Sequence, residues 1–198
     1  MRVSGAIRVR RSARRFSRET IPKEALRAIV EAGRLAPSGA NRQPWHYVLV
    51  DDGVMKKRIR GECESADRKW WSEAPNWFLR WASSASLSRR KPFLEEAPFL
   101  VSVFYDATKP YSLESTWIAI GFMILQATEF GLATLPYTPA NTTVGELLNV
   151  PRRYALAAIL PIGLARDPHV KRRGIKGLDE IASYNGYGRP ISGLFGDH

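Results

Sequence analysis

Cysteine and histidine are nearly absent from the chain, and their scarcity removes several kinds of site. Cys63 is the only cysteine in the 198 residues, so an internal disulfide and a cysteine-based zinc site are both excluded. The three histidines, His46, His169 and His198, are not spaced as a metal-binding pair. We therefore expect no metal centre and no disulfide-stabilised fold.

Long apolar runs and glycine-rich phosphate motifs are also missing. The longest uninterrupted apolar stretch, residues 155–165, contains a proline and a glycine and is far shorter than the roughly 20 residues that span a bilayer. The start of the chain has no apolar core of a signal peptide, which predicts a cytoplasmic location without membrane partners. Rossmann, P-loop and Gly-x-Ser-x-Gly motifs do not occur. If the protein is an enzyme, an organic cofactor should supply the chemistry.

Acidic residues are scarce relative to basic ones. There are 19 acids against 30 lysines and arginines, which gives a net charge of +11. Residues 2–18 hold arginines and no acid, and a second basic cluster spans residues 171–176. Two such clusters form a phosphate site if the fold brings them together, and otherwise a solvated surface. Nucleic-acid binding is the rival interpretation, but it is disfavoured because stacking platforms interleave aromatic with basic residues, and the tryptophans stand apart from the basic runs.

Helical and strand-like patterns alternate without repeats, which predicts one domain over residues 1–184 and a C-terminal tail over 185–198. Pro22 fits the first position of an amphipathic helix that stops before Pro37. Strands are predicted at 47–50, 99–105, 132–135 and 157–162, and a capping box at 143–146. The helix at 113–130 is apolar around most of its circumference. One subunit has little room to cover such a helix, which favours a dimer interface.

Residues 61–97 interrupt this pattern as a long excursion between two strands. Trp70, Trp71, Trp77 and Trp81 lie close together in it, and Pro75 stands between the two pairs. The segment fits two interpretations: a satellite hydrophobic cluster, or an aromatic lid over a flat ligand.

Two segments are dense in groups that bind an organic cofactor. Arg10-Arg11-Ser12-Ala13-Arg14 offers guanidinium groups and a hydroxyl suited to a phosphate monoester. Residues 36–45, Ala-Pro-Ser-Gly-Ala-Asn-Arg-Gln-Pro-Trp, form a loop of small residues, amides and prolines before a strand. Such a loop lets backbone groups approach a flat polar ring closely.

Together these segments resemble the nitroreductase family of FMN-dependent flavoproteins. Its members open with an Arg-Arg-Ser-x-Arg-x-Phe-like segment and continue, one helix later, into Ala-Pro-Ser-x-x-Asn-x-Gln-Pro-Trp. The resemblance extends through Leu160-Pro161-Ile162-Gly163-Leu164 and implies an α+β fold with a central mixed β-sheet flanked by helices in an intertwined homodimer. The expected function is electron transfer from NAD(P)H through FMN to a small aromatic acceptor of nitroaromatic, quinone or halophenol type. The alternative is a flavin-binding or flavin-consuming protein without that turnover.

The resemblance also assigns cofactor contacts. Four residues match the family's contacts to the phosphate and ribityl chain: Arg10, Arg11, Ser12 and Arg14. Four more match the loop that reaches the partner subunit's flavin: Pro37, Ser38, Gly39 and Asn41. In the C-terminal basic cluster, Arg172 is the first candidate and Arg173 the second for a family arginine on the phosphate.

Within the family the chain is nearest the branch that contains iodotyrosine deiodinase. Tyr137-Thr138-Pro139-Ala140-Asn141 resembles that branch's Thr-Thr-Pro-Leu-Asn, in which a threonine faces flavin N5. The match makes Thr138 the expected catalytic residue. The alternative interpretation of Thr138 from its sequence context is a turn residue before a proline, and the catalytic interpretation is slightly favoured.

The same branch holds its substrate with a Glu, a Tyr and a Lys from the lid. Lys91 matches the lysine, and we expect Lys91 and Trp71 to bind substrate. The tyrosine position falls near Trp70 or Trp71, and the acidic position is open between Glu64 and Asp67. These departures favour a flat aromatic or nitroaromatic substrate over iodotyrosine.

Overall fold

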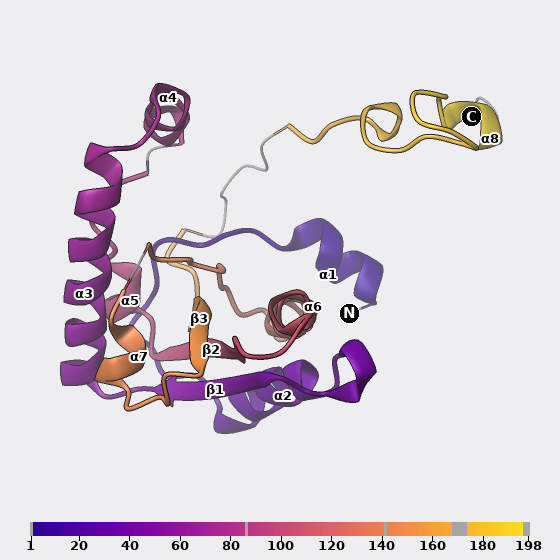
Figure 1. The fold of residues 1–198 in the computed structure, drawn as a ribbon. Helices are drawn as coiled ribbons and strands as arrows, with labels where there is room; N and C mark the ends of the chain where they lie inside the picture. The colour runs from indigo at the N-terminus through magenta and orange to yellow at the C-terminus, as the bar shows by residue number, and fades with distance from the viewer. Residues whose placement is uncertain (1, 86, 141, 168–173, 196–198) are drawn as a thin grey trace.

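A three-stranded antiparallel sheet lies between two sets of helices in the computed structural model, which describes residues 2–85, 87–140, 142–167 and 174–195 (Figure 1). Its strands, in spatial order, are β1 (Trp45–Val50), β2 (Phe99–Asp106) and β3 (Tyr154–Ile162). β2 is central, and Ser102 pairs with Val48 on one side and Ile159 on the other. Buried β-branched and aromatic residues account for the central position of β2.

The expected mixed character of the sheet is confined to one edge. Both ladders are antiparallel, and the parallel pairing in the described part of the chain is a single bridge between Ser12 and Thr134. The strand predicted at 132–135 is therefore reduced to bridges at Ala133 and Thr134. Pro136 follows directly and has no N–H with which to extend the pairing.

Helices α2 (Lys23–Arg34) and α6 (Ser112–Glu129) cover one face of the sheet. Ile29 from α2 and Met123 from α6 pack against Val101 and Leu160 and are fully buried. α6 follows the sequence prediction to within a residue at each end. Pro22 precedes α2 rather than being its first member, and the helix ends at Arg34, three residues before Pro37. This layer forms the main hydrophobic core.

The other face is covered by α3 (Gly53–Ser72), α5 (Phe93–Glu96) and α7 (Val144–Leu147). Ile59 and Cys63 of α3 are fully buried there, and Lys56 Nζ donates to the Ala97 carbonyl at 2.8 Å. The capping box predicted before α7 does not form, because the Thr143 hydroxyl bonds to Glu62 at 2.7 Å instead.

The second half of α3 leads away from the sheet toward α4 (Asn76–Ser84), at the far end of the excursion (Figure 1). Pro75 ends the first helix and precedes the second, as proline geometry predicts. The two helices meet at Phe78, whose ring contacts Trp70 at 4.6 Å and Trp71 at 5.3 Å between centroids.

Four short elements complete the described chain: α1 (Val3–Val9), 3-10 turns at Gly39–Asn41 and Leu178–Glu180, and α8 (Ser192–Phe195). Figure 1 shows the C-terminal segment from residue 174 extending away from the sheet. None of the helices among the described residues has the length and apolar character needed to cross a bilayer. The domain division at residue 184 stays a prediction.

Candidate functional site

A cavity of about 840 Å³ opens between the outer end of α3, the segment before α5 and the loop at 135–140. Its size lies within the usual range for small-molecule and cofactor sites. Aromatic rings form much of its wall: Trp70, Trp71, Phe78, Phe93 and Tyr137. The site can therefore hold a flat aromatic ligand.

The cavity wall is positively charged. Arg14, Arg15, Arg90 and Lys91 line it, against the single acid Asp67. Arg15 and the neighbouring backbone are held by Glu96, whose carboxylate accepts from the Phe16 amide at 3.1 Å. Four cations in a concave, partly apolar site favour an anionic ligand such as a phosphate or a phenolate.

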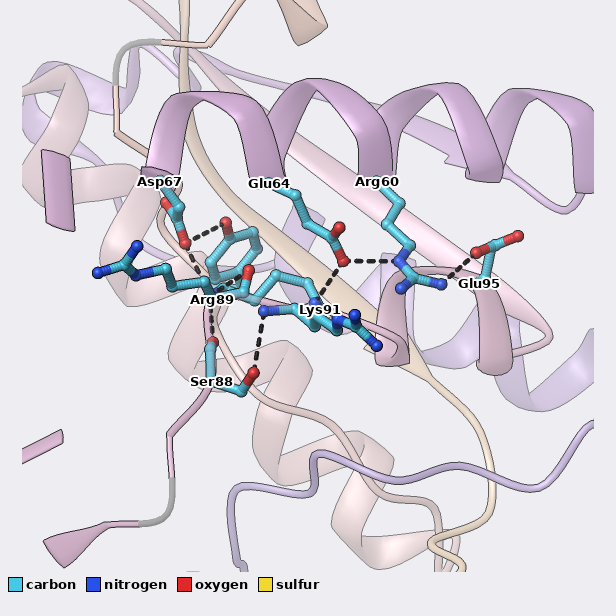
Figure 2. Close-up of polar contacts among 9 residues, drawn as sticks. Arg60, Glu64, Asp67, Ser88, Arg89, Lys91 and Glu95 are labelled. Atoms are coloured by element: carbon cyan, nitrogen blue, oxygen red, sulfur yellow. Dashed lines mark hydrogen bonds and ion pairs between the residues drawn. The ribbon is translucent and has the colours of Figure 1, made fainter. Parts of the chain in front are cut away.

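A buried ion pair joins the two walls of the cavity (Figure 2). Lys91 Nζ lies 2.8 Å from Asp67 Oδ2, and each side chain is 8% exposed. The ammonium also donates to the Ser88 carbonyl at 2.7 Å and the Arg89 carbonyl at 3.3 Å. Lysine has three N–H donors, so these three acceptors use all of them. Lys91 can meet a ligand anion only by exchanging one of these partners.

Tyr137 completes this ion pair from the loop that carries Thr138. Its hydroxyl donates to Asp67 Oδ2 at 3.0 Å, and its ring lies 5.7 Å from Lys91 Nζ. Burial, reinforced by the Asp67 carboxylate, raises the pKa of the Tyr137 hydroxyl far above its usual range. The phenol therefore stays protonated and remains a hydrogen-bond donor to Asp67.

Glu64, the other candidate for the acidic position, has a structural role in this arrangement. Its carboxylate accepts from Arg60 Nε at 2.7 Å and from the Lys91 backbone amide at 2.7 Å (Figure 2). Burial alone would raise the pKa of Glu64, but these hydrogen bonds and the Arg60 charge outweigh it and lower the pKa. Arg60 also pairs with Glu95 at 2.6 Å. Of the two acids that the sequence left open, Asp67 is the one that faces the Lys91 ammonium.

The residues predicted to contact the cofactor divide into two groups. Arg14 and Thr138 line the cavity, and Thr138 is solvent-exposed there. Arg10, Arg11 and Ser12 do not line it: Arg11 Nη1 donates to the Arg8 and Arg10 carbonyls, and Ser12 forms an isolated parallel bridge with Thr134. Arg172 and Arg173 lie outside the described residues, so their contribution stays a prediction.

The loop expected to serve a partner's flavin lies away from the cavity. The Gly39 amide donates to Ser115 Oγ at 3.2 Å on α6, and Ser38 Oγ accepts from the Gln43 amide at 2.9 Å. Pro37 and Asn41 are exposed beside them. The cavity is therefore lined by Arg14, Trp71, Lys91 and Thr138 of this chain and by no residue of the 37–41 loop. If the site is shared between subunits, the loop would have to come from the partner.

The tryptophan-rich excursion contributes both to the cavity wall and to an aromatic cluster, and its role as a lid stays a prediction. Trp70, Trp71 and Phe78 form a wall of the cavity, as a lid would. Trp77 and Trp81 also contact Phe78, with ring centroids 6.0 and 5.6 Å away, and are 65% and 44% exposed. Sequence reasoning missed Phe78, although its place between four tryptophans in the sequence was the available signal.

Comparison with known proteins agrees with this architecture. The model of the nitroreductase family matches residues 7–164. The chain belongs to the nitroreductase family. The iodotyrosine deiodinase of Thermotoga neapolitana is 39% identical over 163 residues, covering 82% of this chain and 88% of the relative. That of Nematostella vectensis is 31% identical over 192 residues, covering 89% of this chain and 72% of the relative.

Solved structures show the same family fold. An iodotyrosine deiodinase bound to FMN and 3-iodo-L-tyrosine superposes with a TM-score of 0.87 at 35% identity, over 94% of this chain and all of the other. A BluB-like flavoprotein from Clostridium difficile 630 superposes with a TM-score of 0.77 at 22% identity, over 94% of this chain and all of the other, and supports the fold alone. The family and the nearest branch inferred from the motifs are both confirmed.

Proposed function

We propose that this nitroreductase-family protein binds FMN and reductively dehalogenates a halogenated phenol that carries an amino-acid headgroup. The observation that carries the proposal is the buried Asp67–Lys91 pair in an aromatic, positively charged cavity. The similarity to iodotyrosine deiodinases supports it. NAD(P)H remains the expected source of electrons.

The described residues fit FMN at one end of the cavity. Arg14 would pair with the phosphate and Thr138 would donate to the flavin ring. Thr134 Oγ1 is buried without a hydrogen-bond partner in the described part of the chain, beside the bridge to Ser12. A buried hydroxyl of this kind is stabilised by a polar ligand group such as the ribityl hydroxyls. Bound FMN, once reduced, would supply the two electrons of the reaction.

The Asp67–Lys91 pair explains why an amino-acid headgroup fits. A free carboxylate on the ligand can take the place of Asp67 on Lys91, and the ligand's ammonium can then pair with Asp67. The exchange keeps every charge in this buried region compensated, whereas a singly charged ligand would leave Asp67 or Lys91 without a partner. Tyr137 holds Asp67 in position through its hydroxyl.

The aromatic ring of the substrate would lie between the aromatic wall and the flavin. The positive charge of Arg14, Arg15 and Arg90 lowers the pKa of a bound phenol and favours its phenolate. The overall reaction is balanced as Ar–X + 2 e⁻ + H⁺ → Ar–H + X⁻. Nitroaromatic or quinone reduction is the second candidate, because the aromatic wall alone accommodates such acceptors.

We also propose that the protein acts as a homodimer. Leu113, Trp117, Ile118 and Phe122 of α6 are between 37% and 43% exposed, although this helix is part of the core. Packing against a second copy would bury these side chains of α6 from solvent, and would bring the 37–41 loop to the partner's site. Sedimentation that finds a folded, FMN-loaded monomer at low concentration would contradict this.

Ligand discrimination tests the function. FMN-loaded protein should bind 3-iodotyrosine, measured by flavin fluorescence quenching, and Lys91→Ala should weaken that binding about 10- to 100-fold through lost charge-assisted hydrogen bonds. Affinity for 2-iodophenol, which has no headgroup, should change less than about 3-fold. Lys109→Ala is the control, since Lys109 is also paired with an aspartate, Asp106, but outside the cavity.

Three outcomes would contradict the proposal. A protein that takes up no FMN has no flavin chemistry. If Lys91→Ala loses the same affinity for 3-iodotyrosine and 2-iodophenol, Lys91 does not bind the headgroup. Dithionite-reduced protein that converts nitrophenol but releases no iodide from 3-iodotyrosine would favour the second candidate.

A further inference from the structure

One face of α4 presents an unusual surface to solvent. Trp77 is 65% exposed and Trp81 44% exposed, and exposed Arg80 lies between them in the sequence. Positions 77, 80 and 81 share one side of a helix, because residues three and four apart are neighbours on its surface. Phe78, which contacts Trp70, and the buried Ala82 lie farther round the helix and pack inward. We call the outward side, residues 77, 80 and 81, the α4 face.

Positive charge surrounds this face. Exposed basic side chains flank it before and after α4: Arg68, Lys69, Arg89 and Arg90. Over residues 68–90 the only acid is Glu73. Exposed tryptophan and arginine are the residue types that contribute most binding energy at protein interfaces. The surface is therefore suited to an acidic protein.

The α4 face also lies beside the opening of the candidate site. Trp70, Phe78 and Arg90 belong to the same excursion and line the cavity that would hold FMN. A protein docked on the α4 face would therefore stand next to the flavin site, on the side formed by this excursion.

We propose that the α4 face and its basic flanks dock a small acidic electron-carrier protein that reduces the bound FMN. The inference rests on the proposed binding of FMN and names the immediate electron donor. Each of two carrier molecules gives up one electron, and these two electrons with one proton from solvent reduce FMN. NAD(P)H then acts one step earlier, through the reductase of the carrier.

Two other partners fit the surface less well. A membrane-binding helix needs a continuous apolar face, and Arg80 interrupts the apolar pair on α4. Single-stranded nucleic acid can stack on tryptophan beside arginine, but its binding would not explain why the α4 face lies next to the candidate flavin site. Nucleic acid is therefore an outcome that the experiment must distinguish.

The test uses the FMN-loaded protein and a reduced plant-type [2Fe–2S] ferredoxin, an acidic one-electron carrier. Stopped-flow absorbance follows flavin reduction in wild type, Arg80→Glu and Trp77→Ser. At about 10 mM salt, ferredoxin should reduce the flavin of Arg80→Glu about 5- to 10-fold more slowly than that of wild type. The difference between the two rates should shrink in about 0.5 M salt, where charges are screened. Arg27→Glu, which reverses an exposed charge on α2, is the matched control and should react at the wild-type rate.

Reduction by dithionite separates docking from the flavin itself and should be the same in all variants. Equal ferredoxin rates in wild type and Arg80→Glu at low salt would overturn the inference. A second result would also overturn it: a short single-stranded oligonucleotide binds through Arg80 and Trp77, while the rate of flavin reduction by ferredoxin depends on neither residue. Dehalogenation driven by dithionite does not depend on the α4 face, so its failure would count against the proposed function alone.

Discussion

The buried Asp67–Lys91 pair gives the sharpest prediction about the site, because its energetics follow from its burial. Lys91→Met removes the cation and leaves Asp67 buried, with the Tyr137 hydroxyl still donating to its carboxylate. Removing one partner of a buried ion pair costs about 3 to 5 kcal/mol. We expect the lower end, about 3 kcal/mol, since Tyr137 continues to donate and the cavity admits water.

For a chain of this length each kcal/mol shifts the melting temperature by about 2 to 4 °C, so Lys91→Met should lower it by about 6 to 12 °C. The double variant Asp67→Asn/Lys91→Met removes both charges, and the asparagine oxygen can still accept from Tyr137. It should regain about 1 to 2 kcal/mol relative to Lys91→Met, because no unpaired charge stays buried.

Urea unfolding followed by tryptophan fluorescence measures these differences, at equal protein and FMN concentrations so that binding contributes equally. A loss below about 1 kcal/mol in Lys91→Met would show that the pair behaves like a solvent-exposed one. A double variant less stable than Lys91→Met would refute the coupling between the two charges. Either result would remove the physical basis for exchange with a zwitterionic ligand.

Three further predictions address individual groups. Arg14→Ala should weaken FMN binding by about 1.5 to 3 kcal/mol in a fluorescence titration, and unchanged affinity would remove Arg14 from the phosphate site. Tyr137→Phe should lower the free energy of unfolding by about 1.5 kcal/mol and raise KM for a zwitterionic substrate more than it changes kcat, because the lost hydrogen bond positions Asp67. Glu64 has a lowered pKa in the folded state, so its carboxylate stabilises the folded protein. This contribution to the free energy of unfolding should be complete above the unfolded pKa of about 4.3 and should disappear as pH falls through the folded pKa. The stability advantage of wild type over Glu64→Gln should therefore shrink on acidification in urea titrations, and an advantage that is constant from pH 6 to pH 3 would contradict the assignment.

Local signals predicted most of the fold. The apolar spacing after Pro22 located α2, and the short apolar runs at 47–50 and 99–105 located β1 and β2. Pro75 located the break between α3 and α4, because proline cannot continue a helix. The strand at 132–135 was overestimated, since its composition fits a strand but Pro136 and the single bridge to Ser12 limit its pairing.

The arrangement inside the candidate site was less predictable because it depends on contacts between distant segments. Lys91 and Trp71 were expected from the family resemblance, and both line the cavity. The sequence could not choose between Glu64 and Asp67, which lie three residues apart and so share one side of α3. The choice is made by the turn after α4, which places the Lys91 ammonium on Asp67 and its backbone amide on Glu64.

Trp71, one of the two tryptophans near the expected tyrosine position of the deiodinase branch, takes part in supporting the lysine. An indole has no acceptor oxygen and cannot bond a ligand as a phenol does, but its π face attracts cations more strongly. The Trp71 ring lies 5.4 Å from Lys91 Nζ, and the Tyr137 ring lies 5.7 Å from the same atom. The ammonium is thus stabilised by two aromatic rings together with Asp67. The tryptophan in place of a tyrosine at first argued against a charged headgroup. Its ring instead helps to hold the Lys91 ammonium in the cavity wall, and this ammonium is the cation that would bind the headgroup.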